Sequence, residues 1–246
     1  MLRLMERMNW MQIEAYLKHD DRIILPTGSM EQHGYCTVAT DSQIAWEISK
    51  TVGEKTGVLV APVNVYSFAG WATAWPGTVS IKPATLLALI SDILESLAGQ
   101  GFKRIMIING HGQNEFAAKL ALEELTNRKP DLNIKFRSWW MLPKTRQIID
   151  ANGTIWGHAS WFESFPWINQ PVEMPGGTKE RYIDQDYFTY GPENARNLLV
   201  DGQGGGDYGK DAEFMSKLYD VAVNELVETL DGSWEKQVFP LPPEKR

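Results

Sequence analysis

The chain has 246 residues, 43% of them hydrophobic and 22% charged, which excludes a disordered protein and suffices for a single α/β domain over residues 1–246. Its formal net charge of −7 argues against a surface that binds nucleic acid non-specifically. The single cysteine, Cys36, rules out an internal disulfide and leads us to expect a cytoplasmic protein. Residues 1–12 contain no continuous apolar run, so we expect neither a signal peptide nor a membrane span.

The first third of the chain predicts two helices and two strands. Residues 9–19 have the apolar spacing of a short amphipathic helix, and the apolar run at 22–26 predicts a buried strand. Asp41 and Ser42 are good N-cap residues for a helix that ends near Gly53 or Gly57. A second apolar run, at 58–63, predicts another buried strand, and an aromatic loop follows it.

Helices and strands continue to alternate in the next third. Helical spacing predicts a helix at 83–100, and an apolar run predicts a strand at 104–108, followed by a helix at 114–128 and a strand at 133–140. Nearly all-apolar strands separated by helices are typical of a parallel sheet with helices on both faces. We therefore expect a three-layer αβα sandwich with a mostly parallel central sheet.

The last third is less regular. Residues 143–207 are rich in Gly, Pro and aromatic residues, which predicts irregular structure before a helix at 211–230. Residues 235–246 read as an extended tail. No repeat or linker divides the chain.

Side chains that bind metals follow two of the predicted strands. Glu31, His33 and Asp41 come after the first strand, and His111, flanked by two glycines, comes after the strand at 104–108. A lone histidine after a strand is more often an ordinary polar loop residue. Two carboxylates and two imidazoles at the carboxyl ends of parallel strands nevertheless favour a metal site. Because these four cannot saturate two ions, such a site would be catalytic rather than structural.

Four motifs carry a resemblance to a known family. They are Thr27-Gly-Ser-Met-Glu-Gln-His-Gly34 with Asp41, Pro76-Gly-Thr78, Asn109-Gly-His-Gly112 and His158-Ala-Ser-Trp-Phe-Glu-Ser164. Together they resemble the creatininase family over residues 20–215. The resemblance implies a homo-hexamer and two divalent ions of zinc, manganese or iron. It also implies that Glu31 and His111 bind one ion, His33 binds the other, and Asp41 bridges the two.

Departures from the family pattern make creatinine itself a poor candidate substrate. Gln113 stands where creatininase has a glutamate ligand, so the second ion needs another carboxylate. Glu163 is the obvious substitute, as a ligand or as a group that moves protons. Ala72 replaces a histidine that many relatives carry. We expect Gln113, Trp75 and Trp156 to contact the substrate.

These residues predict a hydrolase in which a metal-bound hydroxide attacks the carbonyl of a small cyclic amide. His158 would pass a proton to the leaving group, although it could instead be a loop histidine that caps a turn. One alternative is a ring-opening C–C hydrolase of an oxidised cyclic polyol, of the diketo-inositol type. Another is a non-catalytic binding or maturation protein on the same fold.

Overall fold

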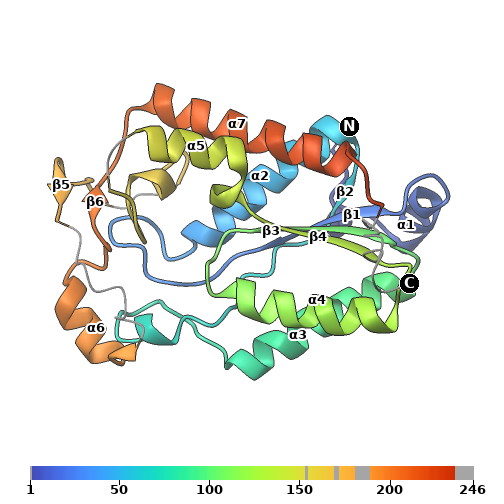
Figure 1. Cartoon of the computed structure of the whole chain (residues 1–246), viewed down its shortest axis with the longest axis horizontal. Coiled ribbons are helices and arrows are strands. Elements are labelled where there is room, and N and C mark those ends of the chain that lie inside the picture. Colours follow the sequence, from blue (N-terminus) through green and yellow to red (C-terminus); the bar gives the residue numbers. More distant parts are fainter. Residues whose placement is uncertain (1, 153–154, 169–171, 181–188, 236–246) are drawn as a thin grey trace, which may run out of the picture.

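The computed structural model describes residues 2–152, 155–168, 172–180 and 189–235, and its centre is a parallel four-stranded sheet (Figure 1). The strand order is β2-β1-β3-β4, with bounds β1 (Arg22–Thr27), β2 (Leu59–Val60), β3 (Arg104–Asn109) and β4 (Asn133–Ser138). The register pairs Thr27 with Asn109 and Asn109 with Ser138. Three strands therefore end level, and the loops that follow them leave from one edge of the sheet.

Helices cover both faces of this sheet, which confirms the expected three-layer sandwich (Figure 1). On one face lie α2 (Thr40–Thr56), α5 (Pro143–Ala151) and α7 (Ala212–Asp231). On the other lie α1 (Trp10–Leu17), α3 (Pro83–Gly99) and α4 (Asn114–Arg128). Because successive strand residues point to opposite faces, Ile23 and Leu25 pack with the second group and Ile24 with the first.

Two predicted strands are shorter than expected. The run at 58–63 is paired with β1 only at Leu59–Val60. Hydrogen bonding to β1 resumes at Asn64, whose N–H donates to the Pro26 carbonyl, so residues 62–63 interrupt the ladder. The strand predicted at 133–140 ends at Ser138, and a short 3-10 turn, Trp139–Met141, follows it. Both strands still lie where the sequence placed them.

The start of α2 differs from the prediction. Ala39 occupies the cap position, and Asp41 lies inside the first turn without capping a helix N–H. Its carboxylate is engaged elsewhere, by the Ser29 hydroxyl and by two histidines. A carboxylate in a helix's first turn is nevertheless favoured by the helix dipole.

The segment 143–207, predicted to be irregular, contains two helices, α5 and α6 (Pro192–Leu199), and a short strand pair. The strand pair joins β5 (Thr178–Lys179) to β6 (Gly206–Asp207). Each helix begins with a proline at its first turn, a position that proline favours. Most of the predicted tail lies outside the described residues. No helix in the described part of the chain is long and apolar enough to cross a membrane.

Candidate metal centre

The site is built where the loops after β1 and β3 meet the first turn of α2. Gly110 makes this approach possible, because a Cβ atom there would lie 2.2 Å from the backbone oxygen of Asp41. Asn109 fixes the same loop: its side chain donates to the carbonyl of His111 at 2.8 Å and accepts the His111 N–H at 3.1 Å. The predicted ligands from the two loops are thus brought together.

Glu31, Asp41 and His111 form the first group of possible ligands. Nδ1 of His111 lies 2.8 Å from Oδ2 of Asp41 and 3.4 Å from Oε2 of Glu31. Nε2 of His111 lies 3.0 Å from the carbonyl oxygen of Phe68, which can only accept. This contact places the ring hydrogen on Nε2 and leaves the Nδ1 lone pair facing the two carboxylates.

His33, Asp41 and Glu163 form the second group. Nδ1 of His33 donates to the carbonyl of Glu31 at 3.0 Å, so Nε2 presents its lone pair. That atom lies 2.9 Å from Oδ1 of Asp41 and 3.8 Å from Oε2 of Glu163. The Ala159 N–H, held in the left-handed region at φ 60°, donates to Glu163 at 2.7 Å. Asp41 belongs to both groups through different oxygens, as the predicted bridge requires.

The separations within both groups fit shared ions. Two ligands that each lie about 2.1 Å from a zinc ion cannot be more than about 4.2 Å apart, and all four distances above are shorter. The five candidate ligand residues are 1–7% exposed. Nε2 of His33 and Oε1 of Glu31 are buried without a hydrogen-bond partner in the described structure. Buried, inward-facing donor atoms of this kind suit a divalent cation.

The charges of the cluster also favour a bound cation. Burial raises the pKa of Glu31 to about 7 and that of Glu163 to about 8. Burial alone would lower the pKa of His33 and His111, but the adjacent carboxylates raise these values to about 10 and about 9. Burial opposes ionisation of Asp41 as well, yet the two histidines hold its pKa well below the usual range. Without metal, protons supply the positive charge that the carboxylates need.

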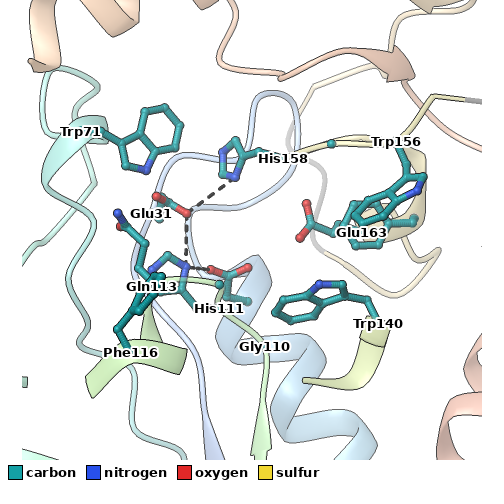
Figure 2. A pocket seen from close by; sticks show the side chains of 14 residues that line it. Glu31, Trp71, Gly110, His111, Gln113, Phe116, Trp140, Trp156, His158 and Glu163 are labelled. Carbon is teal, nitrogen blue, oxygen red and sulfur yellow. Dashed lines mark hydrogen bonds and ion pairs between the residues drawn. The ribbon is translucent and has the colours of Figure 1, made fainter. Parts of the chain in front are cut away.

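His158 lies beside this cluster (Figure 2). Its Nε2 donates to the Gln32 carbonyl at 2.8 Å, and its Nδ1 lies 3.7 Å from Oε2 of Glu31. Burial, with His33 close by, lowers the pKa of His158 well below its usual range, so the ring is neutral. Glu31, His33 and His158 also form a third group of possible ligands, a role for His158 that the sequence did not suggest.

A cavity of about 420 Å³ opens onto the cluster, and aromatic rings form much of its wall (Figure 2). Gln113 and Trp156 line it, as predicted for substrate contacts, whereas Trp75 lies outside the lining. Trp75 packs edge-on against Trp71, with ring centroids 5.7 Å apart, and it is Trp71 that reaches the cavity and hydrogen-bonds to Glu31. The sequence did not suggest two aromatic residues of the wall, Phe116 and Phe162. Two others, Trp71 and Trp140, lie in segments beside the predicted site but were not among the expected substrate contacts.

Two polar residues that support the cluster were also missed. The Ser29 hydroxyl donates to Oδ2 of Asp41 at 2.7 Å. The Gln32 side chain accepts the Gly34 N–H and donates to the Gly202 carbonyl, which ties the ligand loop to the Gly-rich segment 202–206. Their positions inside one motif, residues 27–34, were the only available signal.

The family model for creatininase, described as creatinine amidohydrolase, matches residues 6–230. The chain belongs to the creatininase family. Its members are metal-dependent hydrolases, and this chain keeps the predicted ligands of both ions in contact distance of one another. The family expectation drawn from the four motifs is therefore confirmed.

Curated proteins that are similar in sequence to this chain are named for different activities. Creatinine amidohydrolase from Pseudomonas putida is 31% identical over 154 residues, which cover 58% of this chain and 59% of that protein. The 3-dehydro-scyllo-inosose hydrolase from Thermotoga maritima is 31% identical over 48% of this chain and 39% of that protein. The mycofactocin precursor peptide peptidase from Mycolicibacterium smegmatis is 38% identical over 41% of this chain and 44% of that protein. The chain thus spans less than two thirds of each of these relatives.

Solved creatininase structures share the whole fold. One crystal structure of creatinine amidohydrolase superposes with a TM-score of 0.75 at 21% identity, covering 94% of this chain and 99% of the other. A creatininase variant of the Zn–Zn type superposes with a TM-score of 0.72 at 24% identity, covering 92% and 96%. At these identities the likeness establishes the creatininase fold.

Proposed function

We propose that the chain is an amidohydrolase that opens a small cyclic amide with the help of two divalent ions, zinc, manganese or iron. The observation that carries the proposal is the double engagement of Asp41, whose two oxygens face His33 at 2.9 Å and His111 at 2.8 Å. Glu31 and Glu163 complete the two groups. Two ions held in this way would supply an activated water at neutral pH and polarise the carbonyl that it attacks.

The protein's own side chains account for orientation and proton movement. Glu163, fixed by the Ala159 N–H, stands at the cavity wall and can hold or pass a proton. His158 is neutral and reaches the same cavity, so it can accept a proton and return it to the leaving group. Trp71 and Trp156 line the cavity with apolar rings, which would leave less room for bulk water around a bound substrate.

One alternative chemistry is supported by a specific residue. Gln113 lies on the cavity wall where creatininase has a charged glutamate. A neutral amide cannot donate or accept a proton in catalysis as a carboxylate can. The 3-dehydro-scyllo-inosose hydrolase from Thermotoga maritima is also similar in sequence to this chain. Ring opening of an oxidised cyclic polyol by C–C hydrolysis is therefore the second candidate. The intact ligands argue against the third, a non-catalytic binding protein.

The first test is metal content by elemental mass spectrometry, on protein purified without chelator, beside an Asp41→Ala variant. The proposal expects about two transition-metal ions per chain in the wild type and none in the variant. The loaded protein would then be assayed against cyclic amides and cyclic keto-polyols, and the preferred class decides between the two chemistries. A wild type that binds no metal after reconstitution would overturn both.

The family resemblance also supports a homo-hexamer. Sedimentation equilibrium of the metal-loaded protein tests this, since a hexamer of the 27.8 kDa chain is readily distinguished from a monomer or dimer.

A further inference from the structure

A second cavity adjoins the metal centre and has no part in the function proposed above. It measures about 370 Å³ and lies between the first turns of α3 and α4. Its described lining is apolar apart from one amide, and comprises Phe68, Pro83, Ala84, Leu86, Leu87, Gln113, Phe116, Ala117 and Leu120. We call this cavity the α3–α4 groove. No charged side chain is among these residues, so the groove suits an apolar ligand.

The α3–α4 groove shares a wall with the catalytic cavity. Gln113 and Phe116 line both, and Figure 2 shows the two side chains at the edge of the metal cluster, beside His111. The two cavities therefore meet at Gln113 and Phe116, and a substrate long enough to pass these side chains could occupy both. From Gln113 to Leu120, α4 covers about 10 Å, at 1.5 Å per residue.

An unsatisfied polar atom marks the junction. Oε1 of Gln113 is buried and has no hydrogen-bond partner within the described structure. A buried acceptor without a donor is unfavourable, because it has lost its hydrogen bonds to water without gaining a partner, so a ligand N–H at this point would be favoured. The amide thus points to a ligand that carries a donor between its reacting carbonyl and its apolar part.

Exposed apolar side chains continue the groove to the surface. Phe116 is 76% exposed and Leu120 is 57% exposed, and their spacing of four residues places them side by side on α4. Adjacent exposed apolar side chains beside a cavity are typical of binding surfaces. Of the described residues that line either cavity, none is a lysine or arginine, so no cationic side chain is placed to pair with an anionic substituent of the substrate.

We propose that the α3–α4 groove binds an apolar extension of the substrate, an aliphatic or aromatic group attached through an N–H-bearing link to the carbonyl that is hydrolysed. This inference rests on the proposed function, because it assumes that the reacting carbonyl sits at the metal cluster. It narrows the substrate class to neutral amides with an apolar substituent and disfavours compact, fully polar rings.

The test uses alkyl hydroxamic acids, from acetohydroxamic to octanohydroxamic acid, titrated calorimetrically into zinc-reconstituted protein. The two hydroxamate oxygens can bind the metal cluster, and the alkyl chain on the carbonyl carbon probes the groove. N-alkyl-N′-hydroxyureas of the same chain lengths place an N–H between that carbonyl and the alkyl chain, as the proposal requires, and should bind more tightly than the matching hydroxamic acids; equal affinities would refute the N–H-bearing link. Each methylene that enters the groove should tighten binding by about fourfold, the value expected for burial of one CH₂ group. Leu120→Glu should abolish this dependence on chain length. Asn127→Glu adds the same charge to an exposed position of α4 outside the groove and should preserve it.

The outcomes separate the two proposals. Tight acetohydroxamate binding with no gain from longer chains would overturn the groove proposal and leave the metal site intact. The absence of binding by every hydroxamate would overturn the metal site and the groove together. A flat chain-length series, with an oligomer that dissociates in Leu120→Glu, would identify the groove as a contact between copies of this chain and overturn the proposal.

Discussion

Nε2 of His33 faces Oδ1 of Asp41 across 2.9 Å, yet the two atoms do not meet in the direction of a hydrogen bond. His33 already donates through Nδ1 to the carbonyl of Glu31, which leaves Nε2 with a lone pair. A lone pair and a carboxylate oxygen this close repel each other unless a proton or a cation stands between them. The pair therefore needs a bound cation or, in the metal-free protein, the proton that the raised pKa of His33 supplies, and several experiments follow from it.

Replacing single carboxylates should remove the ions separately. Glu163→Gln and Glu31→Gln each exchange one ligand of one group for a neutral amide, a weaker ligand for zinc-like ions, so each variant should retain about one ion per chain. Asp41→Asn weakens both groups and should retain none. Metal content after gel filtration measures this, with circular dichroism as the check on folding. Two ions retained in Glu163→Gln would show that Glu163 is not a ligand.

The hydroxyl of Ser29 should strengthen metal binding through Asp41. Ser29→Ala removes the 2.7 Å hydrogen bond that orients this carboxylate, and loss of such a support weakens metal affinity by about 10- to 100-fold. Ser49→Ala is the matched control, because it removes another buried hydroxyl of the described core that has no hydrogen-bond partner. Competition with a chromophoric zinc chelator gives both affinities. Equal affinities in the two variants would contradict the role assigned to Ser29.

Metal binding should release protons and weaken as the pH falls. Each of His33, His111 and Glu163 has a pKa raised above 7, to about 10, about 9 and about 8, so at pH 7 the metal-free protein holds protons on these groups. An incoming cation must displace them, and a lower pH makes that displacement harder. Titration calorimetry in buffers of different ionisation enthalpy counts the protons, and we expect more than one per chain at pH 7. A binding enthalpy independent of the buffer would refute this account.

Gly110 should be far less tolerant of substitution than its neighbour Gly112. A Cβ atom at Gly110 would lie 2.2 Å from the Asp41 carbonyl oxygen, whereas one at Gly112 meets nothing within 4 Å. Gly110→Ala should lower the free energy of unfolding by about 1–3 kcal/mol or more, as expected for overpacking. Gly112→Ala should change it by less than about 1 kcal/mol. Urea denaturation of both metal-free variants makes the comparison, and equal destabilisation would contradict it.

Much of the site could be predicted because its ligands follow strands. His33 and His111 come directly after apolar runs, and parallel strands bring their carboxyl ends to one edge. Glu163 was found only through its motif. Ser29 and Phe116 were missed because their roles depend on contacts across the fold, such as the hydroxyl of Ser29 reaching Asp41 on α2.

The fold was predictable to a similar extent. The sequence predicted all four strands of the central sheet, but hydrophobicity alone did not show that residues 62–63 interrupt the pairing of β2 with β1. Helices α5 and α6 have only 9 and 8 residues, too short for a periodic pattern to stand out among the glycines and aromatic residues around them. The prolines at their first turns, a position that proline favours, were the signal that could have predicted these helices.

The level ends of β1 and β3 have a consequence for how the protein matures. Thr27 pairs with Asn109, and the ligands on the two loops are set by that pairing. A slip of one residue would displace His111 by about 3.3 Å along β3 and turn its strand neighbours to the opposite face. Such a sheet could not place His111 and Asp41 on one ion. A bound ion would therefore stabilise only molecules in which β1 and β3 are paired in the correct register.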